Sequence, residues 1–375
     1  MWAIKCDSGR LILEDKDNCL GIVIRIHSNY YYVDYNNETW ECMLRSKLKK
    51  EGTEPKVGDK VLIDEFKIVT KDDVISIHSA VITSILTRNN ELDKPNVANI
   101  DQAIIVTSTY SPDFNPLLLD KFIVLSESNN INPIICINKS DKIDEDLREF
   151  IEKTYRNIGY EIVYTSAKEN QGLDDLKNVL SNKISVLTGV SGSGKSSLIN
   201  AINPELSLQV AEVSKNLGTG RHTTRHVSLQ KVFFNNQKAL IADTPGFSFI
   251  ELNNIQSKEL AWNFREFTPF IPECALSDCL HWQEPDCNVK RNINTETSRY
   301  NNYLNLLIEV LGFEKINNAR SSKKESQVKI SQRADGKNIR VVKIGSQARE
   351  DSRRTVKQEL SEIGKRTSID DMEED

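Results

Sequence analysis

The segment Gly189-Val-Ser-Gly-Ser-Gly-Lys-Ser196 constrains this chain of 375 residues more than any other stretch. It fits the pattern G-x-x-x-x-G-K-[ST], in which glycines allow backbone N–H groups to turn inward and surround a polyphosphate. An apolar run at 184–189 predicts a strand before the loop, and residues 196–202 predict a helix after it. This order predicts an α/β domain that binds a nucleotide, and it leaves the base unspecified.

Individual residues of this loop have separate expected tasks. The Lys195 ammonium is expected to neutralise the β- and γ-phosphate oxygens, and the Ser196 hydroxyl is expected to bind Mg²⁺. The helix that follows directs its positive end at the phosphates. The complete predicted phosphate-binding set is Gly189, Val190, Ser191, Gly192, Ser193, Gly194, Lys195, Ser196 and Ser197.

A base-reading segment lies upstream of the phosphate loop. The apolar run 132–138 predicts a strand buried on both faces, and it ends in Asn138-Lys139-Ser140-Asp141. The Asp141 carboxylate can accept two N–H bonds from guanine, a donor pair that adenine lacks. Lys139 can lay its stem along the base plane, and Asn138 can tie the loop together. The predicted nucleotide is therefore GTP or GDP.

Two further segments complete the predicted nucleotide site. Ser166, Ala167 and Lys168 follow a strand-like stretch and can offer backbone N–H groups to the guanine carbonyl oxygen. Downstream of another buried run, Asp243 is expected to hold Mg²⁺ through water, and the Gly246 amide is expected to sense the γ-phosphate. Thr223 or Thr224, in the loop between, is expected to complete the Mg²⁺ shell. The predicted magnesium ligands are Ser196, Thr224 and Asp243.

The order of these segments predicts a circular permutation. An ordinary GTPase runs from the phosphate loop through two switch segments to the base-reading loops, whereas here both base-reading loops come first. The predicted helix 172–180, normally the last, leads directly into the strand of the phosphate loop. Such a permutation requires the ordinary termini to be neighbours in space, which is common in compact domains. We expect this α/β domain, with a mostly parallel sheet, to span residues 93–262.

The N-terminal part of the chain reads as short strands. Five β-branched or aromatic runs between residues 18 and 90 are separated by Asn, Gly and Lys turns. This number of strands favours a small barrel over residues 1–92, OB-like by count, and an SH3-like barrel is the alternative.

Three cysteines and a histidine cluster downstream of the α/β domain. Cys274, Cys279, His281 and Cys287 have the spacing C-x4-C-x-H-x5-C, which offers three thiolates and one imidazole for a tetrahedral site. The N-terminus lacks a signal-peptide core, and no apolar run is long enough for a membrane span, so we expect a cytoplasmic protein with reduced cysteines. One structural zinc ion is then favoured over disulfides, and clustered cysteines without a metal are the alternative. This part is predicted to form a mainly helical domain over residues 263–315.

The remaining residues, 316–375, form a tail of different composition. Basic residues outnumber acidic ones between Arg320 and Arg366, although the whole chain has a net charge of −5. Because this tail is weakly apolar and highly charged, we expect it to be disordered. Its basic character favours contact with RNA phosphates, and a solvated tail is the alternative.

Taken together, these segments resemble the bacterial ribosome small-subunit-dependent GTPase A family. The resemblance covers residues 18 to about 312 and rests on the permuted motif order, on the Cys/His spacing and on the segment LDKPNVANIDQ at 92–102. It implies an OB barrel, a circularly permuted P-loop GTPase domain and a C-terminal zinc domain. It also implies late maturation of the small (30S) ribosomal subunit, with contact to 16S rRNA. We expect a monomer that does not associate with a membrane.

The residue after Gly246 bears on the expected mechanism. Many GTPases have a glutamine there to orient water, whereas this chain has Phe247, and the family also carries an apolar residue. Intrinsic hydrolysis is therefore expected to be slow, with His222 or His226 as the candidate catalytic residue that orients water. The predicted function is ribosome-stimulated hydrolysis of GTP to GDP and phosphate. The alternatives are an RNA-binding scaffold that holds guanine nucleotide without hydrolysis and a permuted GTPase of the large subunit.

Overall fold

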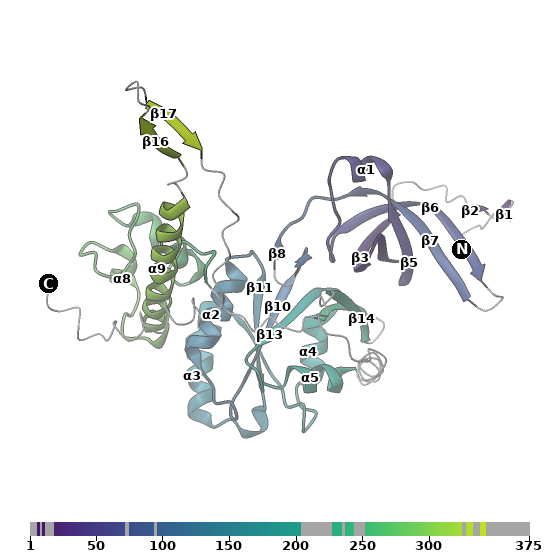
Figure 1. Cartoon of the computed structure of the whole chain (residues 1–375). Helices are drawn as coiled ribbons and strands as arrows, with labels where there is room; N and C mark the ends of the chain where they lie inside the picture. The colour runs from purple at the N-terminus through teal and green to yellow at the C-terminus, as the bar shows by residue number, and fades with distance from the viewer. Residues whose placement is uncertain are drawn as a thin grey trace. The chain divides into compact units, whose positions relative to one another are not determined.

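The computed structural model describes residues 6–7, 10–11, 19–71, 75–93, 96–203, 227–234, 237–243, 252–324, 328–332 and 338–342. The chain divides into two compact units, residues 1–313 and 314–375. Figure 1 shows the first unit as a β-barrel, an α/β layer and a helical region in chain order. Among the described residues, no helix combines the length and the apolar character that crossing a bilayer requires.

The N-terminal barrel confirms the five predicted strands. They are β3 (Leu20–His27), β4 (Tyr30–Tyr35), β5 (Glu38–Leu44), β6 (Lys60–Lys71) and β7 (Ile75–Ile85). Their order is β3-β4-β5-β7-β6, and a β3–β6 pairing closes the barrel, with β5 and β7 parallel. This closed five-stranded order is the OB-like arrangement. Residues that alternate inward, such as Val33, Trp40 and Val61, form its core.

Short elements accompany the barrel. The first unit also contains β1 (Cys6–Asp7), β2 (Arg10–Leu11), α1 (Ser46–Lys50), β8 (Glu91–Asp93) and β9 (Asn96–Ala98). The β8–β9 hairpin lies between the last barrel strand and the α/β region, and Val97 pairs with Val57 in an isolated bridge. The segment that joins barrel and α/β region in sequence is therefore itself attached to the barrel.

The α/β region confirms the predicted mostly parallel sheet. Its strands run in the order β12-β11-β10-β13-β15-β14, and β14 alone is antiparallel to its neighbour in this part. The strands are β10 (Gln102–Ser108), β11 (Asn132–Asn138), β12 (Glu161–Tyr164), β13 (Ile184–Gly189), β14 (Ser228–Phe234) and β15 (Gln237–Asp243). Strand β14 was not predicted, because its sequence SLQKVFF mixes polar and apolar residues.

Helices cover both faces of this sheet. They are α2 (Pro116–Glu127), α3 (Glu145–Tyr155), α4 (Leu173–Leu180) and α5 (Lys195–Ile202), with short 3₁₀ turns η1 (Ser140–Lys142) and η2 (Arg156–Ile158). In Figure 1, α2 and α3 lie on one side of the strands and α4 and α5 on the other. Successive residues of β10 alternate between these layers: Ile104 packs with α4 and α5, and Ile105 packs with α2 and α3. This burial on both faces explains the continuous apolar runs in the sequence.

Barrel and α/β sheet are continuous through β3 and β14. Ser228 pairs with Arg25 across them, so that the strands form one sheet of 11. The Asp34 side chain on β4 is fully buried. Its carboxylate accepts hydrogen bonds from Lys231 (3.0 Å) and Lys238 (2.6 Å) of the β14–β15 hairpin. One barrel carboxylate thus joins the barrel to two strands of the nucleotide-binding region.

The helical region follows the α/β layer. Its elements are α7 (Ser257–Leu260), η3 (Ala261–Asn263), η4 (Ile271–Glu273), α8 (Asn288–Asn292) and α9 (Ser298–Lys324). The mainly helical domain was expected to end at residue 315, whereas α9 continues to Lys324. Six of the residues 314–324 are Lys, Glu, Ala or Arg, which are good helix formers, and this segment lacks proline.

The second unit contains a hairpin where we expected disorder. Strands β16 (Val328–Gln332) and β17 (Asn338–Val342) pair antiparallel, with Gln332 opposite Asn338. Both segments are rich in β-branched residues, and Asp335-Gly336 lies between them in sequence, which is a hairpin signal that net charge obscured.

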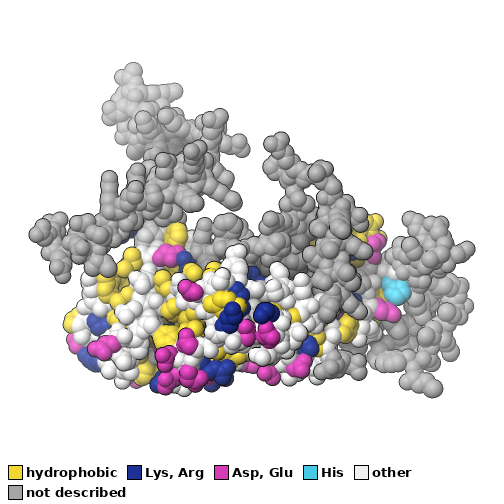
Figure 2. All heavy atoms as spheres, turned by 90° about the horizontal axis from the view of Figure 1, so that it is seen from below, with side chains coloured by type: hydrophobic (Ala, Val, Ile, Leu, Met, Phe, Trp, Pro, Cys, Tyr) yellow, Lys and Arg dark blue, Asp and Glu magenta, His cyan; other side chains and the backbone are white. Residues whose placement is uncertain are grey.

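Acidic and basic side chains are mixed over the described surface. Figure 2 shows one face of the molecule, on which Lys and Arg are interspersed with Asp, Glu and hydrophobic side chains. This mixture agrees with the small net charge of −5.

Candidate nucleotide and metal sites

The predicted nucleotide-binding segments meet at the carboxyl end of the parallel sheet. Strand β10 pairs with β11 on one side and β13 on the other, so that Val106 is opposite both Cys136 and Gly189. The loops that follow β11 and β13 therefore emerge at the same edge, where open α/β sheets bind ligands.

The phosphate loop has the backbone that its glycines predict. Gly189, Gly192 and Gly194 have φ angles of 132°, 81° and 95°, in the region that side chains disfavour. A Cβ on Gly189 would lie 2.0 Å from the carbonyl oxygen of Val106, so the loop can pass β10 only without a side chain there. Helix α5 begins directly after the loop, at Lys195.

The Lys195 ammonium lies over the loop itself. It donates hydrogen bonds of 2.8 Å to the carbonyl oxygens of Gly189 and Val190. Burial lowers the pKa of Lys195 from its ordinary value. A negatively charged group at this position would offset that desolvation, which is a property of a phosphate-binding lysine.

Asn138 connects the base-reading loop to the phosphate loop. Its amide Nδ2 donates to the Ser193 carbonyl oxygen at 2.8 Å, and its Oδ1 accepts from the Ala167 N–H at 3.4 Å. The Thr165 hydroxyl donates to the same Oδ1 at 3.4 Å. A Cβ on Gly194 would lie 2.2 Å from Asn138 Nδ2, so this junction also requires a glycine. The structure therefore brings the three predicted loops into one cluster.

Lys139 and Asp141 lie on the exposed side of this junction. Lys139 has a left-handed backbone (φ 59°), and its ammonium donates to the Gly192 carbonyl oxygen at 3.1 Å. The pKa of Asp141 is lowered, chiefly by a side-chain hydrogen bond from Ser166 and further by the positive charges of Lys168 and Lys142. An ionised Asp141 is the form that can accept the guanine N–H pair.

The predicted magnesium set is placed in part. Ser196 is the second residue of α5, and Asp243 is the last residue of β15, which pairs with β13 next to the phosphate loop. The other predicted switch residues lie outside the part of the chain that the structure describes: Thr223, Thr224, Gly246 and the candidate catalytic histidines His222 and His226.

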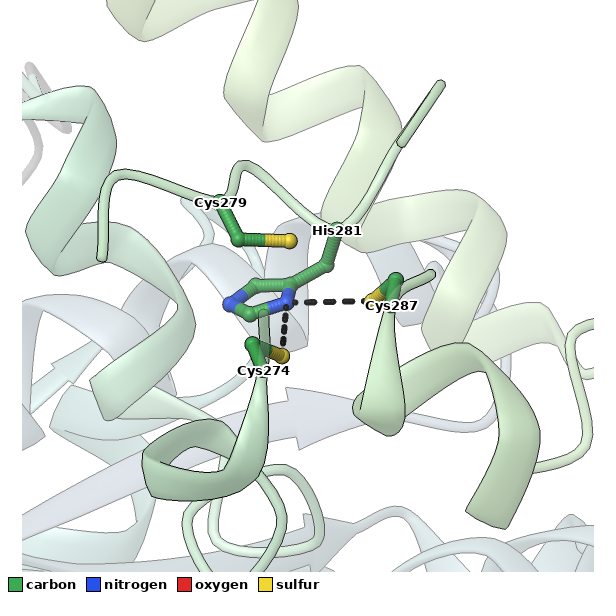
Figure 3. Close-up of side chains that lie close together, drawn as sticks. All are labelled: Cys274, Cys279, His281 and Cys287. Atoms are coloured by element: carbon green, nitrogen blue, oxygen red, sulfur yellow. Dashed lines mark hydrogen bonds between the residues drawn. The ribbon is translucent and has the colours of Figure 1, made fainter. Parts of the chain in front are cut away.

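A second site gathers the three cysteines and the histidine. One potential ligand atom from each of Cys274, Cys279, His281 and Cys287 lies within 4.8 Å of the others. Figure 3 shows the four side chains converging, with His281 Nδ1 at 3.7 Å from the Cys274 sulfur and 3.3 Å from the Cys287 sulfur. Three sulfurs and one imidazole nitrogen are a donor set that suits a tetrahedral metal ion.

The cluster lies in an apolar environment. Burial raises the pKa of the Cys279 thiol to about 12, raises that of Cys287 and lowers that of the His281 imidazole. A cation at the centre would reverse the effect on the thiols, because it stabilises thiolates. Without one, burial favours the neutral form of each group.

Several residues that support the two sites escaped the sequence analysis. The hydroxyls of Tyr300 and Tyr303 on α9 donate to the carbonyl oxygens of His281 (2.8 Å) and Leu280 (2.6 Å). The Glu284 carboxylate accepts from the N–H groups of Leu280 and Trp282. In the sequence, the i, i+3 spacing of Tyr300 and Tyr303 indicates only that the two tyrosines share a helix face. At the candidate nucleotide site, the sequence analysis also missed the contacts made by residues 109–112 after β10, because this segment contains no motif.

These features define a class of protein. A phosphate loop joined to a guanine-reading loop that precedes it in sequence, on a parallel sheet, is the arrangement of a circularly permuted P-loop GTPase. Residues 83–253 match the family model of the RsgA GTPase, and residues 20–72 match that of the RsgA N-terminal domain. The chain belongs to the RsgA GTPase family, and it is a GTPase by that membership.

Individual relatives align with this chain over most of their lengths. The chain is 44% identical over 296 residues to the small ribosomal subunit biogenesis GTPase RsgA 2 of Oceanobacillus iheyensis, covering 77% of this chain and 97% of the relative. It is 43% identical over 305 residues to the small ribosomal subunit biogenesis GTPase RsgA of Thermotoga maritima, covering 79% and 98%.

Two solved structures resemble this one. The crystal structure of YjeQ from Thermotoga maritima has a TM-score of 0.63 and 39% identity, covering 78% of this chain and 98% of that chain. YloQ, described as a circularly permuted GTPase, also has a TM-score of 0.63, with 34% identity and coverage of 78% and 95%. These likenesses confirm the predicted family and the permuted fold.

Proposed function

We propose that this chain hydrolyses GTP to GDP and phosphate in the biogenesis of the small ribosomal subunit, and that this subunit stimulates turnover. The observation that carries the proposal is the 2.8 Å hydrogen bond from Asn138 Nδ2 to the Ser193 carbonyl oxygen, because it joins a guanine-reading loop to a phosphate loop. The names of the relatives, small ribosomal subunit biogenesis GTPases, supply the biological context.

In the proposed complex, each loop keeps the task expected from its sequence. Asp141 accepts the two guanine N–H bonds, and the backbone of residues 166–168 donates to the guanine carbonyl oxygen. Lys195 exchanges its bonds to the loop carbonyls for bonds to phosphate oxygens. Ser196, Asp243 and Thr224 hold Mg²⁺, which neutralises phosphate charge when bound. The Gly246 amide senses the γ-phosphate, and His222 or His226 orients the attacking water.

We further propose that the cluster of Cys274, Cys279, His281 and Cys287 holds one structural zinc ion. All four tetrahedral positions are then filled by protein atoms, which leaves no open position for catalysis. The ion would fix the segment 274–287 against α9. Tyr300 and Tyr303 of α9 already form hydrogen bonds to this segment.

The proposed partners follow from the family context. We propose that the barrel (1–92), the GTPase domain (93–262) and the zinc domain (263–315) act together on the 30S subunit and its 16S rRNA, as a cytoplasmic monomer. The basic composition of residues 316–375 would favour contact with rRNA phosphates.

Measurement of GTP turnover across a titration with purified 30S subunits tests the function. We expect slow turnover by the chain alone and at least about tenfold stimulation by 30S particles. Lys195→Ala should abolish turnover, and 50S particles are the matched control. Stimulation by 50S particles alone would indicate a large-subunit GTPase. Binding to 30S particles without GTP turnover would indicate the scaffold alternative, which Phe247 in place of a water-orienting glutamine permits.

A further inference from the structure

The backbone of Lys139 has an unusual conformation at the centre of the guanine-reading loop. Its φ and ψ angles are 59° and 33°, in the left-handed region that residues with side chains seldom occupy. The 3₁₀ turn Ser140–Lys142 starts directly after it, and Asp141 is the middle residue of that turn. The direction of the Asp141 carboxylate therefore depends on Lys139 keeping this conformation.

Thr109 holds the Lys139 backbone from the neighbouring strand. Thr109 is the first residue after β10, and its side-chain hydroxyl donates to the Lys139 carbonyl oxygen at 2.9 Å. Its backbone N–H also donates to the Asn138 carbonyl oxygen, at 3.3 Å. On the opposite side, the Ser140 N–H donates to the Thr165 carbonyl oxygen at 3.0 Å. The strained residue is thus fixed between the loops that follow β10 and β12.

The residues after Thr109 also hold the Lys139 side chain. The Lys139 ammonium donates to the carbonyl oxygens of Ser111 (2.5 Å) and Tyr110 (3.3 Å), in addition to Gly192 in the phosphate loop. The Ser108 hydroxyl donates to the Pro112 carbonyl oxygen at 2.7 Å and closes this short loop. The loop 109–112 therefore contacts both the backbone and the ammonium of Lys139, and this ammonium in turn contacts the phosphate loop.

We propose that Thr109 is a positioning residue for guanine recognition. Its hydroxyl stabilises the left-handed Lys139, and through it the orientation of the Lys139 stem and of the Asp141 carboxylate. It acts through these residues and does not itself touch the base. The inference rests on the proposed guanine nucleotide site, and it assigns a role to a segment that none of the recognised motifs contains.

Thr109→Val tests this role, because valine keeps the shape and loses the hydroxyl. We expect the dissociation constant for GDP to rise about tenfold, as loss of one hydrogen bond to a strained loop predicts. The ratio of GDP affinity to IDP affinity should decrease. IDP lacks the exocyclic amine, so this ratio measures how well the Asp141 carboxylate is oriented toward that amine. Thr109→Ser restores the hydroxyl and should restore both values. Equilibrium titration with GDP and IDP measures them.

A matched control separates positioning from general stability. The Thr268 hydroxyl donates to the Arg265 carbonyl oxygen, also at 2.9 Å but in the helical region, so Thr268→Val should leave both nucleotide affinities unchanged. The inference is overturned if Thr109→Val keeps the wild-type ratio of GDP to IDP affinity, even with a lower melting temperature. A wild-type chain that binds ADP as well as GDP would instead remove the proposed function.

Discussion

At the scale of the residue, Asn138 and Asp141 have different roles at the candidate nucleotide site. Both the nitrogen and the oxygen of the Asn138 side-chain amide form hydrogen bonds with other loops, so Asn138 connects these loops. Asp141, in contrast, is exposed, and its lowered pKa keeps it ionised at neutral pH. A side chain that is ionised and exposed at a site edge is available to a ligand, whereas Asn138 is already used by the protein.

The first prediction concerns the choice of base by Asp141. Asp141→Asn replaces one carboxylate oxygen by an amide donor, which cannot accept from the exocyclic amine of guanine. Xanthine carries an oxygen there, so the variant should lose GDP affinity by about 100-fold or more and should bind XDP better than the wild type does. Equilibrium titration with both nucleotides measures the exchange. Unchanged GDP affinity would contradict the assignment of Asp141 as the base reader.

At the scale of the element, helix α9 is attached to helix α2 by buried charges. Arg299 on α9 donates to Asp120 on α2 at 2.5 Å and to Glu266 at 2.7 and 3.0 Å, and Asn302 donates to the other Asp120 oxygen at 2.6 Å. Burial raises the pKa of Asp120. Although burial also opposes the charged guanidinium, the two carboxylates raise the pKa of Arg299 well above its ordinary value. We interpret the group as an ion pair completed by hydrogen bonds.

The second prediction follows from this network. Arg299→Met leaves two carboxylates without their cation in an apolar environment, and it should lower the free energy of unfolding by about 3–5 kcal/mol. Arg291→Met is the control, because the ion pair of Arg291 with Asp286 is exposed and contributes little. Urea unfolding followed by circular dichroism compares them. Equal losses in the two variants would contradict a structural role for the buried network.

The third prediction concerns the cluster of cysteines and histidine. The full-length chain, purified without added metal, should contain about one zinc ion, and Cys279→Ala should lose it. Cys136→Ala is the control, because Cys136 is also buried but lies in the sheet core away from the cluster. Elemental analysis and melting curves with a chelator measure metal content and its effect. The proposed zinc site would be contradicted if the purified chain contained no metal and its melting temperature did not change when the chelator was added.

At the scale of the whole molecule, the barrel is joined to the two strands, β14 and β15, that lie between the predicted switch segments in the sequence. The β14–β15 hairpin begins just after the predicted switch residues 222–226 and ends at Asp243, and its two lysines share the buried carboxylate of Asp34. Lys231 also donates to the Asn37 carbonyl oxygen and the Thr39 hydroxyl. Together with the Ser228–Arg25 pair, this contact links the hairpin to the barrel.

The fourth prediction tests this contact. Asp34→Ala removes the shared acceptor and leaves two lysines without it, so the barrel should unfold independently and calorimetry should resolve two transitions. Asp64→Ala is the control, because the Asp64 carboxylate, also on the barrel, accepts from its neighbour Glu65 at the surface. Identical calorimetric profiles for the two variants would contradict a coupling role for Asp34.

The sequence by itself determined the elements and the identity of the loops. Continuous apolar runs predicted the strands of the α/β sheet, because burial on both faces selects such runs. Glycine spacing predicted the phosphate loop, since its backbone excludes side chains at Gly189 and Gly194. The order of the loops predicted the permuted family. Strand β14 was not predicted, because its residues mix polar and apolar types, and the hairpin β16–β17 was not predicted, because the high charge of the tail predicted disorder.

Only the tertiary structure decided which residues support these loops. Thr109 lies 30 positions before Lys139 in the chain, and Asp34 lies 197 and 204 positions before the two lysines that it binds. Such pairs carry no local signal, because a hydrogen bond between distant segments depends on strand order and register, which residue type alone does not specify. Motifs name the atoms that can contact a ligand, and the packing of the sheet determines what holds those atoms in place.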